Sequence, residues 1–290
     1  MKNFALIGAA GYIAKRHVEA IKINNGNLLM MCDPNDNVGY IDSFFPNCNY
    51  FKVIERFDRE LHRLDYLNNK IDFVSICSPN YLHDSHIRLS LRNNCDVICE
   101  KPLVLKTEHL KMLQEIEKKH SKKVYTILQL RLHPTIINLK KHVENSKEKF
   151  NVKLKYITPR GKWYDYSWKG DFDKSGGVLF NIGIHFFDML IWIFGKPIID
   201  EISLTDKLAV GKLKFQNANV EFFLSINHKD LPYNDWKALR SLEINNKDYN
   251  FSDGFTDLHN VSYQNIINGN GFGIEDIYPS IELIEEMISK

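Results

Sequence analysis

The stretch Phe4-Ala5-Leu6-Ile7-Gly8-Ala9-Ala10-Gly11-Tyr12-Ile13-Ala14 decides the fold, because an apolar run ends there in a glycine turn that opens a helix. Gly8 and Gly11 let the backbone turn tightly and approach a pyrophosphate closely. The helix N-terminus adds unpaired N–H groups and the positive end of the helix dipole. The spacing is GxxGxxA, one residue longer than GxGxxG, so the motif alone also fits a strand-to-helix turn with incidental glycines. Ala10, Tyr12 and Ile13 belong to the same predicted cofactor-binding turn.

Further apolar runs follow, separated by amphipathic stretches, and this alternation predicts a parallel sheet covered on both faces. One of the helices is readable in detail: Thr107 can cap its N-terminus, and Leu110, Leu113 and Ile116 fall on one face. We predict an α/β fold in which residues 1–125 form a doubly wound, nucleotide-binding Rossmann domain. The strands after the first are expected at residues 28–32, 73–77, 96–99 and 124–128.

Asp33 ends the second predicted strand, where an acidic side chain accepts hydrogen bonds from the adenosine ribose hydroxyls of a dinucleotide. The residues that follow, Pro34-Asn35-Asp36-Asn37, contain no Arg or Lys to hold a 2′-phosphate. The predicted cofactor is therefore NAD rather than NADP, with Asp33, Asn35 and Asp36 on its adenosine side.

Two later strand ends also carry polar residues, and in an open α/β sheet ligands bind beyond the carboxyl ends of the strands. The third strand runs into Ser78-Pro79-Asn80, with His83 three residues further on, and Ser78 or Asn80 can equally cap the next helix. The fourth runs into Glu100-Lys101-Pro102. An apolar strand thus delivers Lys101 to the mouth of the cofactor crevice, and Pro102 restricts Lys101 to an extended backbone. Ser78, Asn80, His83, Glu100 and Lys101 are predicted to contact the cofactor.

The second half reads as a domain of residues 126–290, with room for its C-terminal helices to pack back on the first domain. A helix is expected from His133 to Phe150. No long helix separates the later strands, so a largely antiparallel open sheet is predicted. Its hairpin-like turns include Gln216-Asn217 and Asn245-Asn246. The strands are expected at Val152–Arg160, Ile198–Thr205, Leu208–Phe215, Val220–Asn227 and Leu239–Ile244.

An apolar stretch that begins at Gly176-Gly177 carries Asn181, His185 and Asp188, which fall at i, i+4 and i+7 and share one face of a helix. A single histidine there would fit a core-facing helix, but three polar groups on one stripe favour a functional site. A metal site is not expected, because no carboxylate or cysteine cluster completes the pair His83-x-x-His86.

The order of the glycine turn, Asp33, Ser-Pro-Asn-x-x-His and Glu-Lys-Pro resembles the glucose-fructose oxidoreductase/inositol dehydrogenase (Gfo/Idh/MocA) family. The resemblance implies that Lys101 lies beside the nicotinamide and the reacting sugar hydroxyl, and that His185 is the catalytic histidine. The family commonly has Asp where this chain has Asn181. An amide cannot take a proton at neutral pH, so the general base is expected to be His185, and Lys101 would stabilise the developing alkoxide.

Residues 157–171 are dense in aromatic side chains and cations, a mixture that stacks rings and binds anions, although a surface loop pinned by its aromatics is the alternative. This segment, Leu128-Gln129-Leu130-Arg131 and residues 254–259 resemble one branch of the family. That branch oxidises the 3′-hydroxyl of UDP-N-acetylglucosaminuronic acid for bacterial surface polysaccharide (lipopolysaccharide O-antigen), and also carries Asn at position 181. The predicted substrate-binding residues are Lys101, Arg160, Tyr164, Trp168, Lys169, Asn181 and His185; Gln129 and Trp163 are expected at the cofactor.

Composition excludes several classes of partner. The chain has 38 basic and 36 acidic residues, interspersed along 290 residues, so a nucleic-acid-binding surface is not expected. Its five cysteines show no CxxC spacing and read as free thiols in a reducing cytoplasm. No apolar run approaches membrane-spanning length. The open sheet, with Phe222 and Leu224 on alternate positions, and the family resemblance suggest a homotetramer.

Two alternatives stay open. A dehydrogenase of the same family could act on a free polyol or sugar such as inositol, and would not need Arg160. A non-catalytic NAD-sensing regulator is disfavoured, because it has no need for Lys101 and His185 together. 2-Oxoglutarate is a possible second substrate that would reoxidise the cofactor in place.

Overall fold

A computed structural model of the protein describes residues 1–250 and 257–290. The chain divides into two compact units: Met1–Ile127 with Thr256–Ile277, and Leu128–Phe255 with Tyr278–Lys290. The sequence placed the boundary at 125/126 and left room for C-terminal helices to return. The first unit does include such a segment, so neither unit is continuous in sequence.

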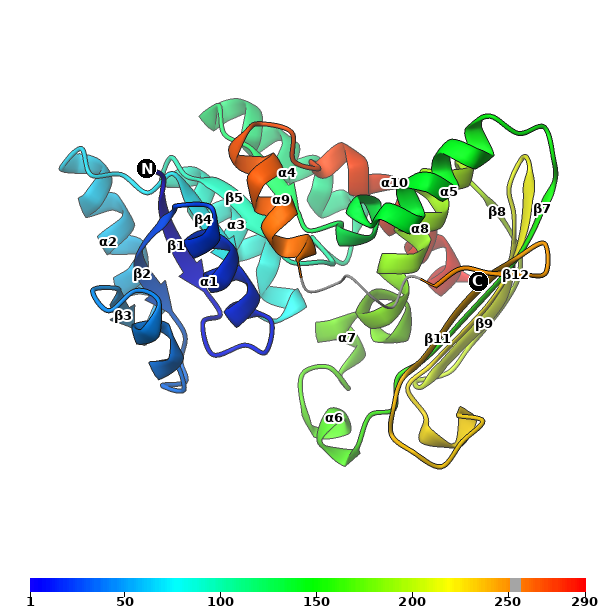
Figure 1. The fold of residues 1–290 in the computed structure, drawn as a ribbon. Helices are drawn as coiled ribbons and strands as arrows, with labels where there is room; N and C mark the ends of the chain where they lie inside the picture. Colours follow the sequence, from blue (N-terminus) through cyan, green and yellow to red (C-terminus); the bar gives the residue numbers. More distant parts are fainter. Residues whose placement is uncertain (251–256) are drawn as a thin grey trace. The chain divides into compact units, whose positions relative to one another are not determined.

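The first unit is built on six parallel strands in the order β3-β2-β1-β4-β5-β6, the doubly wound order that the apolar runs predicted (Figure 1). The strand β3 was not predicted, because its three residues are mostly exposed and lack an apolar run. The strands are β1 (Asn3–Ile7), β2 (Asn27–Cys32), β3 (Asn49–Phe51), β4 (Phe73–Ile76), β5 (Asp96–Cys99) and β6 (Val124–Thr126).

Among the described residues, four α-helices of this unit lie between its strands as crossover connections, and another comes from late in the sequence. The prediction that Thr107 caps α4 is wrong by one position: Lys106 is the extended residue before the helix, and Thr107 is the first helical one. Leu110 and Leu113 are buried as expected, whereas Ile116 is half-buried. The helices are α1 (Ala14–Ile23), α2 (Ile54–Tyr66), α3 (His83–Arg92), α4 (Thr107–His120) and α9 (Leu258–Ile267).

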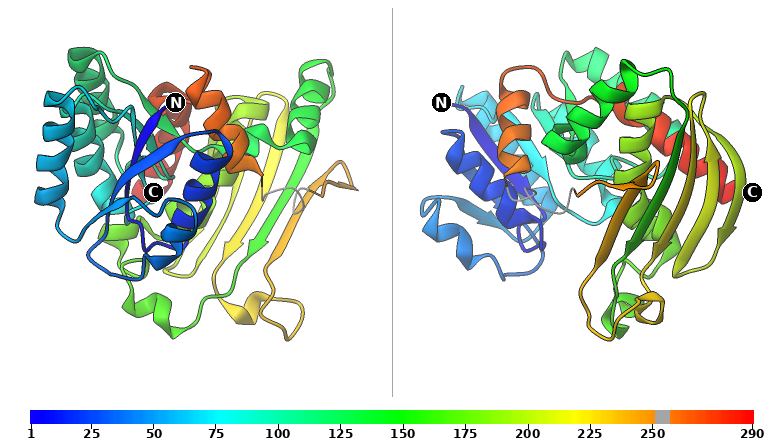
Figure 2. Two further views of the ribbon diagram at one scale, coloured as in Figure 1. Left: turned by 60° about the vertical axis from the view of Figure 1, so that its left-hand side comes forward. Right: turned by 45° about the vertical axis from the view of Figure 1, so that its right-hand side comes forward.

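Helix α9 comes from the far end of the sequence and packs against α1 (Figures 1 and 2). Its Tyr263 is fully buried, with its ring centroid 5.9 Å from that of Phe4 of β1. Ile266 of the same helix belongs to the same hydrophobic cluster. The core of the first unit therefore depends on side chains that are more than 250 residues away from β1.

The second unit contains a six-stranded sheet in the order β12-β11-β7-β10-β9-β8. Only β7 and β10 pair in parallel, so the predicted largely antiparallel sheet is confirmed. Asn245 and Asn246 both have positive φ and form the turn from β11 to β12. The strands are β7 (Phe150–Ile157), β8 (Ile198–Leu204), β9 (Leu208–Lys214), β10 (Ala218–Ser225), β11 (Leu239–Ile244) and β12 (Lys247–Asp248).

Helices α5 and α8 lie along one face of this sheet (Figure 2). The predicted helix from His133 to Phe150 is too long: α5 ends at Glu144, because the polar stretch after it leads into β7 at Phe150. The helices are α5 (Pro134–Glu144), α6 (Lys162–Tyr166), α7 (Phe172–Ser175), α8 (Ile184–Phe194) and α10 (Ile274–Ser289), the last of which begins within the segment assigned to the first unit.

The two faces of the second sheet differ in chemistry. Phe222 and Leu224 are buried on the helix-covered face, where the Phe222 ring lies 5.2 Å from that of Phe187 of α8. Across strands, exposed charges pair instead, as in Lys153–Glu243 at 2.8 Å. Helices of the same chain therefore cover Phe222 and Leu224, and these two residues do not themselves need a partner subunit.

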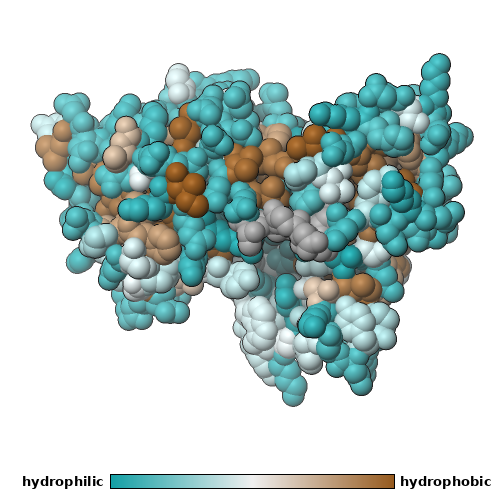
Figure 3. All heavy atoms as spheres, in the orientation of Figure 1, coloured by the Kyte–Doolittle hydropathy of each residue, from teal (hydrophilic) through white to brown (hydrophobic). Residues whose placement is uncertain are grey.

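The apolar helical segment Phe172–Phe194, which runs from α7 through α8, corrects one statement made from sequence. By length and composition it could cross a membrane, so an apolar stretch of that length does exist. However, 72% of its most apolar window is buried inside the protein, which is typical of a core helix. Hydrophilic residues cover most of the face seen in Figure 3, with hydrophobic ones scattered among them.

Candidate active site

Gly8 stands where β1 ends and the chain turns toward α1. Its φ of +84° lies in the left-handed region that favours glycine, and its N–H donates to the carbonyl of Cys32 at 2.9 Å. A Cβ at this position would lie 2.5 Å from backbone atoms of Cys77 and Ser78, and one at Gly11 would lie 3.0 Å from the Gly8 carbonyl oxygen. The turn therefore presents bare backbone, which is the cradle that a pyrophosphate requires.

The start of α1 fits the same role. Ile13 stands at the N-cap position and makes no side-chain cap, and the N–H groups of Ala14 and Arg16 in the first turn donate to the backbone carbonyls of Gly11 and Ile13, each at 3.0 Å. Ala10 and Gly11 are half-buried beside it, and Tyr12 is 90% exposed. The predicted cofactor turn thus combines a helix start without a side-chain cap and two glycines whose positions leave no room for a Cβ.

Asp33 is buried at the end of β2 and ties this turn together. Its Oδ2 accepts a hydrogen bond from the N–H of Ala10 at 2.9 Å, and its Oδ1 accepts from the backbone N–H of Asn35 at 2.8 Å. Asp36 is exposed, and Lys52, which follows β3, lies 3.9 Å from it. Inspection of residues 34–37 alone could not identify Lys52, because it is distant in sequence. Its ammonium is paired with Asp36. Asp33 keeps acceptor capacity on Oδ2 for a ribose hydroxyl.

His83 braces the ends of β4 and β5. Its Nδ1 lies 2.7 Å from the carbonyl oxygen of Pro102, its Nε2 lies 2.8 Å from that of Ser78, and burial lowers the pKa of its imidazole. His86 instead contacts the hydroxyl of Ser78 at 2.9 Å, and burial lowers its pKa to about 4. Asn80 is also buried. The nitrogens of His83 and His86 therefore serve separate partners within the fold.

Glu100 and Lys101 follow β5 directly. The Glu100 carboxylate is buried: Oε2 accepts the backbone N–H of Lys101 at 3.2 Å, and Oε1 lies 3.0 Å from Nε2 of both His17 and His259. Lys101 is half-buried, and its peptide bond to Pro102 is cis. Glu100 was predicted to contact the cofactor, whereas its carboxylate bonds to His17, His259 and the backbone of Lys101, all within the first unit. Sequence reasoning missed His17 and His259.

In the second unit, Asn181 and His185 lie on the helical segment that leads into α8. Residues Leu179–Gly183 form a π-helical turn, a wider turn that is frequent at functional sites, and His185 follows in the first turn of α8. Both side chains are half-buried. The sequence pattern assumed a regular α-helix and gave no signal for the wider turn.

Asp188 does not join these two residues as a third site group. It is buried and forms a two-pronged ion pair with Arg131, with distances of 2.8 and 3.0 Å, and Ser280 donates to it at 3.2 Å. This arrangement anchors α8 to the segments on either side of it. Of the three polar residues predicted to share one helix face, Asp188 is therefore buried in an ion pair with Arg131. Asn181 and His185 remain partly exposed.

The aromatic and cationic segment, residues 157–171, contains α6 and the loop that leads from it to α7 (Figure 1). The ammonium of Lys169 lies 5.7 Å from the ring centroid of Trp163 and 5.6 Å from that of Trp168. Burial, followed by repulsion from Arg160, lowers the pKa of Lys169. Arg160 itself is exposed. Lys169 therefore lies near two indole rings and the guanidinium of Arg160 within one short segment.

Asn181 connects the π-helical turn to this segment. Its Nδ2 donates to the hydroxyl of Tyr164 at 2.9 Å and to the carbonyl of Lys169 at 3.3 Å. Tyr164 is buried, and this burial raises the pKa of its phenol, which therefore stays protonated near neutral pH. An amide suits this position because these two contacts use an N–H donor, which a carboxylate lacks.

Gln129 carries a second sign of a ligand. Its Oε1 is buried and has no hydrogen-bond partner among the described residues. Because buried polar atoms are nearly always paired, an orphaned amide oxygen points to a donor from a bound molecule. The bare glycine turn and this acceptor both fit a dinucleotide. Residues 254–256, part of another stretch quoted for the branch resemblance, lie outside the described residues.

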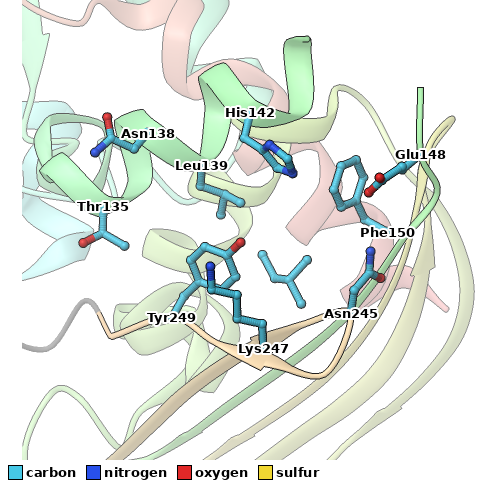
Figure 4. A pocket seen from close by; sticks show the side chains of 10 residues that line it. Thr135, Asn138, Leu139, His142, Glu148, Phe150, Asn245, Lys247 and Tyr249 are labelled. Atoms are coloured by element: carbon cyan, nitrogen blue, oxygen red, sulfur yellow. The ribbon is translucent and has the colours of Figure 1, made fainter. Parts of the chain in front are cut away.

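A cavity of about 510 Å³ opens elsewhere in the second unit, between α5 and the β11–β12 hairpin (Figure 4). His142 and Leu139 of α5 face Tyr249 and Lys247 across it. None of the residues predicted for the active site is among those that line it, so it does not bear on the assignment.

All five cysteines are free, and four of them are buried. Cys48 is half-buried, and burial raises the pKa of its thiol to about 12. None is therefore activated as a nucleophile, in agreement with a role in packing.

Comparison with known proteins points to one family over most of the chain. Residues 2–128 match the family described as "Oxidoreductase family, NAD-binding Rossmann fold" (GFO_IDH_MocA). Residues 148–230 match its "C-terminal alpha/beta domain". Both predicted domain types are thereby confirmed, as is the NAD-binding character of the first.

Solved structures from Thermus thermophilus resemble the whole chain. The WlbA (WbpB) dehydrogenase in complex with NAD and alpha-ketoglutarate is 41% identical, with a TM-score of 0.94, over 99% of this chain and 94% of that one. The same dehydrogenase in complex with NAD and UDP-GlcNAcA is 42% identical, also with a TM-score of 0.94, over 98% of this chain and 94% of that one.

A more distant curated relative is the glucose-6-phosphate 3-dehydrogenase of Bacillus subtilis, 25% identical over 69% of this chain. The matched region spans 56% of that enzyme's length.

Proposed function

This chain belongs to the Gfo/Idh/MocA oxidoreductase family, and from that premise we propose that it oxidises the 3′-hydroxyl of UDP-N-acetylglucosaminuronic acid to a ketone with NAD. The observation that carries the choice of substrate is the segment in which Arg160 and Lys169 accompany Trp168 and Tyr164. A uronic acid linked to a diphosphate has a carboxylate and phosphates for the cations, and a ring for the indole of Trp168.

The chemistry divides between the two units in the proposal. NAD, when bound, accepts the hydride from the sugar carbon. His185 takes the proton of the 3′-hydroxyl as general base, and Lys101 donates a hydrogen bond to the oxygen as negative charge develops on it. Asn181 cannot compete for that proton, because an amide is not basic at neutral pH. Alcohol oxidation is then balanced: two electrons and one proton leave as hydride, and a second proton goes to His185.

The cellular role follows from this chemistry. A 3-keto sugar nucleotide is ready for transamination, so the product fits amino-sugar synthesis for surface polysaccharide. We place the enzyme in the cytoplasm as a homotetramer, and name 2-oxoglutarate as a second substrate that reoxidises the cofactor. Support for the last comes from the related dehydrogenase whose structure holds alpha-ketoglutarate.

The test is absorbance at 340 nm after the protein is mixed with NAD and UDP-N-acetylglucosaminuronic acid, in the presence and absence of 2-oxoglutarate. Mass spectrometry of the sugar nucleotide should show the loss of two hydrogens, even when the cofactor is recycled. Replacing Lys101→Met or His185→Asn should each lower kcat by about 10²-fold or more. An unchanged sugar nucleotide under all conditions would refute the proposal.

Arg160→Ala separates this substrate from a free polyol such as inositol. With a sugar nucleotide the variant should raise KM strongly, because a charge-assisted contact is lost. If the wild-type protein instead oxidises inositol and Arg160→Ala leaves that turnover intact, the substrate is a free polyol. Binding of NAD without turnover of either compound would favour a regulator.

A further inference from the structure

Three buried side chains of the first unit converge behind the predicted catalytic lysine. His17 comes from α1, Glu100 from the end of β5, and His259 from α9. The residues are 0%, 7% and 2% exposed. Both imidazoles place Nε2 at 3.0 Å from the same carboxylate oxygen, Oε1 of Glu100.

The hydrogen bonds fix where the protons are. The hydroxyl oxygen of Ser75 lies 2.6 Å from the hydroxyl oxygen of Tyr263. The Tyr263 hydroxyl in turn lies 2.7 Å from Nδ1 of His17. Since the carboxylate is an acceptor, Nε2 of His17 must carry hydrogen. Burial lowers the pKa of His17, so the ring is neutral and its Nδ1 accepts from Tyr263. Ser75, Tyr263, His17 and Glu100 then form one chain in which every group donates to the next.

Glu100 is ionised at the end of this chain. Burial by itself would raise the pKa of the carboxyl, but the hydrogen bonds from His17 and His259 outweigh it and hold the pKa well below its usual value. The other oxygen, Oε2, accepts the backbone N–H of Lys101 at 3.2 Å. On the far side of Lys101, the carbonyl of Pro102 is held by His83 at 2.7 Å. The backbone around Lys101 is therefore braced before and after it.

We infer that His17 and His259 are positioning residues for the reaction: through Glu100 they fix the backbone from which Lys101 reaches the substrate. This inference rests on the proposed role of Lys101. Neither histidine needs to touch cofactor or substrate, because both act through the carboxylate. Helix α9, which arrives from the end of the sequence, thereby supplies a residue on which the catalytic lysine depends.

The same three side chains have donor atoms within 4.8 Å of one another, a grouping that could also hold a metal ion. Hydrogen bonds account for both 3.0 Å contacts without one. A metal bound in stoichiometric amount to the purified protein would contradict the proton arrangement above, and elemental analysis decides this point.

The experiment compares His259→Leu with His259→Gln. The amide nitrogen of Gln reaches the position of the imidazole Nε2 and can donate to Glu100, whereas Leu cannot. We expect His259→Leu to lower kcat by about 10- to 100-fold, as a small misplacement of a catalytic group does, with little change in KM. His259→Gln should recover most of kcat.

Ile266→Ala is the matched control, because Ile266 is buried on the same helix but lies outside the hydrogen-bonded cluster. It should lower the melting temperature at least as much as His259→Leu while kcat stays near the wild-type value. If kcat falls in step with melting temperature across both variants, or if His259→Leu keeps the wild-type kcat, the positioning role is refuted.

A readout independent of turnover separates this inference from the proposed function. The rate at which an amine-reactive reagent labels Lys101, mapped by mass spectrometry, should change in His259→Leu and be restored in His259→Gln, while labelling of exposed Lys111 stays constant. Were the wild-type protein inactive on the sugar nucleotide, the proposed function would fail, and the labelling pattern would still decide the positioning of Lys101. Equal labelling rates in all three proteins would overturn it.

Discussion

Gly8 provides the positive φ that the predicted cofactor turn requires, and the Asp33 carboxylate accepts a hydrogen bond from the N–H of Ala10 in that turn at 2.9 Å. The two residues are 25 positions apart, yet their roles depend on each other. Without the positive φ at Gly8 the chain would not bring Ala10 to the carboxylate. Without the carboxylate the N–H of Ala10 would lose its acceptor at the end of β2.

Replacing Gly8→Ala should destabilise the fold by at least about 1–3 kcal/mol and abolish NAD binding, because the left-handed backbone is strained for alanine and its Cβ would collide with Cys77. Gly39→Ala is the control, since no atom lies within 4 Å of a Cβ there. Thermal unfolding with and without NAD measures both effects. A Gly8→Ala protein that melts and binds NAD like the wild type would contradict this account.

The pH dependence of substrate binding should report on Lys169. Because burial and Arg160 lower its pKa, the ammonium loses its proton at a lower pH than an ordinary lysine does. Affinity for the anionic sugar nucleotide is therefore expected to be complete at neutral pH and to fall as pH rises through this lowered pKa. Lys169→Arg, which stays charged, should remove that fall. KM measured from pH 7 to 10 in both proteins makes the comparison, and parallel curves would exclude Lys169 as the titrating group.

At the scale of elements, the π-helical turn Leu179–Gly183 departs from regular α-helical geometry. It places Asn181 where one amide group contacts both Tyr164 and the backbone of Lys169. The turn thus links α8, which carries His185, to the segment that carries the cations.

Asn181→Asp tests this link. A carboxylate cannot donate to the carbonyl of Lys169, and it adds a negative charge close to the proposed binding place of an anionic substrate. We expect KM for the sugar nucleotide to rise by about tenfold or more, as loss of a hydrogen bond near a charged ligand does. Asn181→Ser, which removes the amide without adding charge, is the comparison. Equal KM values for the Asp and Ser variants would show that charge is not the cause.

Most elements could be predicted from the sequence because buried strands and their polar turns leave a clear local pattern, as at β11, whose bounds Leu239–Ile244 match the prediction. Features without a local pattern could not. The strand β3 is mostly exposed and lacks an apolar run, and the π-helical turn has the composition of an ordinary apolar helix. The partners of Glu100 are 83 and 159 residues away from it, so only the folded chain brings them together.

At the scale of the whole molecule, the first unit is completed by a late segment. Tyr263 and Ile266 of α9 fill its core, and His259 holds Glu100. Each large apolar side chain is worth about 1.5–3 kcal/mol when buried, and an uncompensated buried carboxylate costs about 3–5 kcal/mol. These contributions together are of the same order as the entire stability of a typical domain.

Residues 1–127 expressed alone should therefore fail to fold cooperatively or to bind NAD. Joining residues 257–277 to them through a flexible Gly/Ser linker should restore both properties. Circular dichroism on heating and NAD titration provide the measurements, and the linked chain with His259→Leu and Tyr263→Ala serves as the control. A sharp melting transition for residues 1–127 by themselves would show that α9 is dispensable.

The late position of α9 in the sequence also determines when the first unit can complete its folding during translation. During translation the first 127 residues emerge long before the helix that completes their core, because about 150 further residues must be added first. At ordinary elongation rates the nascent sheet waits roughly 8 to 30 seconds with the surface that Tyr263 will cover still open to water. The unit that is synthesised first thus completes its core late. A ribosome-associated chaperone would encounter it before α9 is in place.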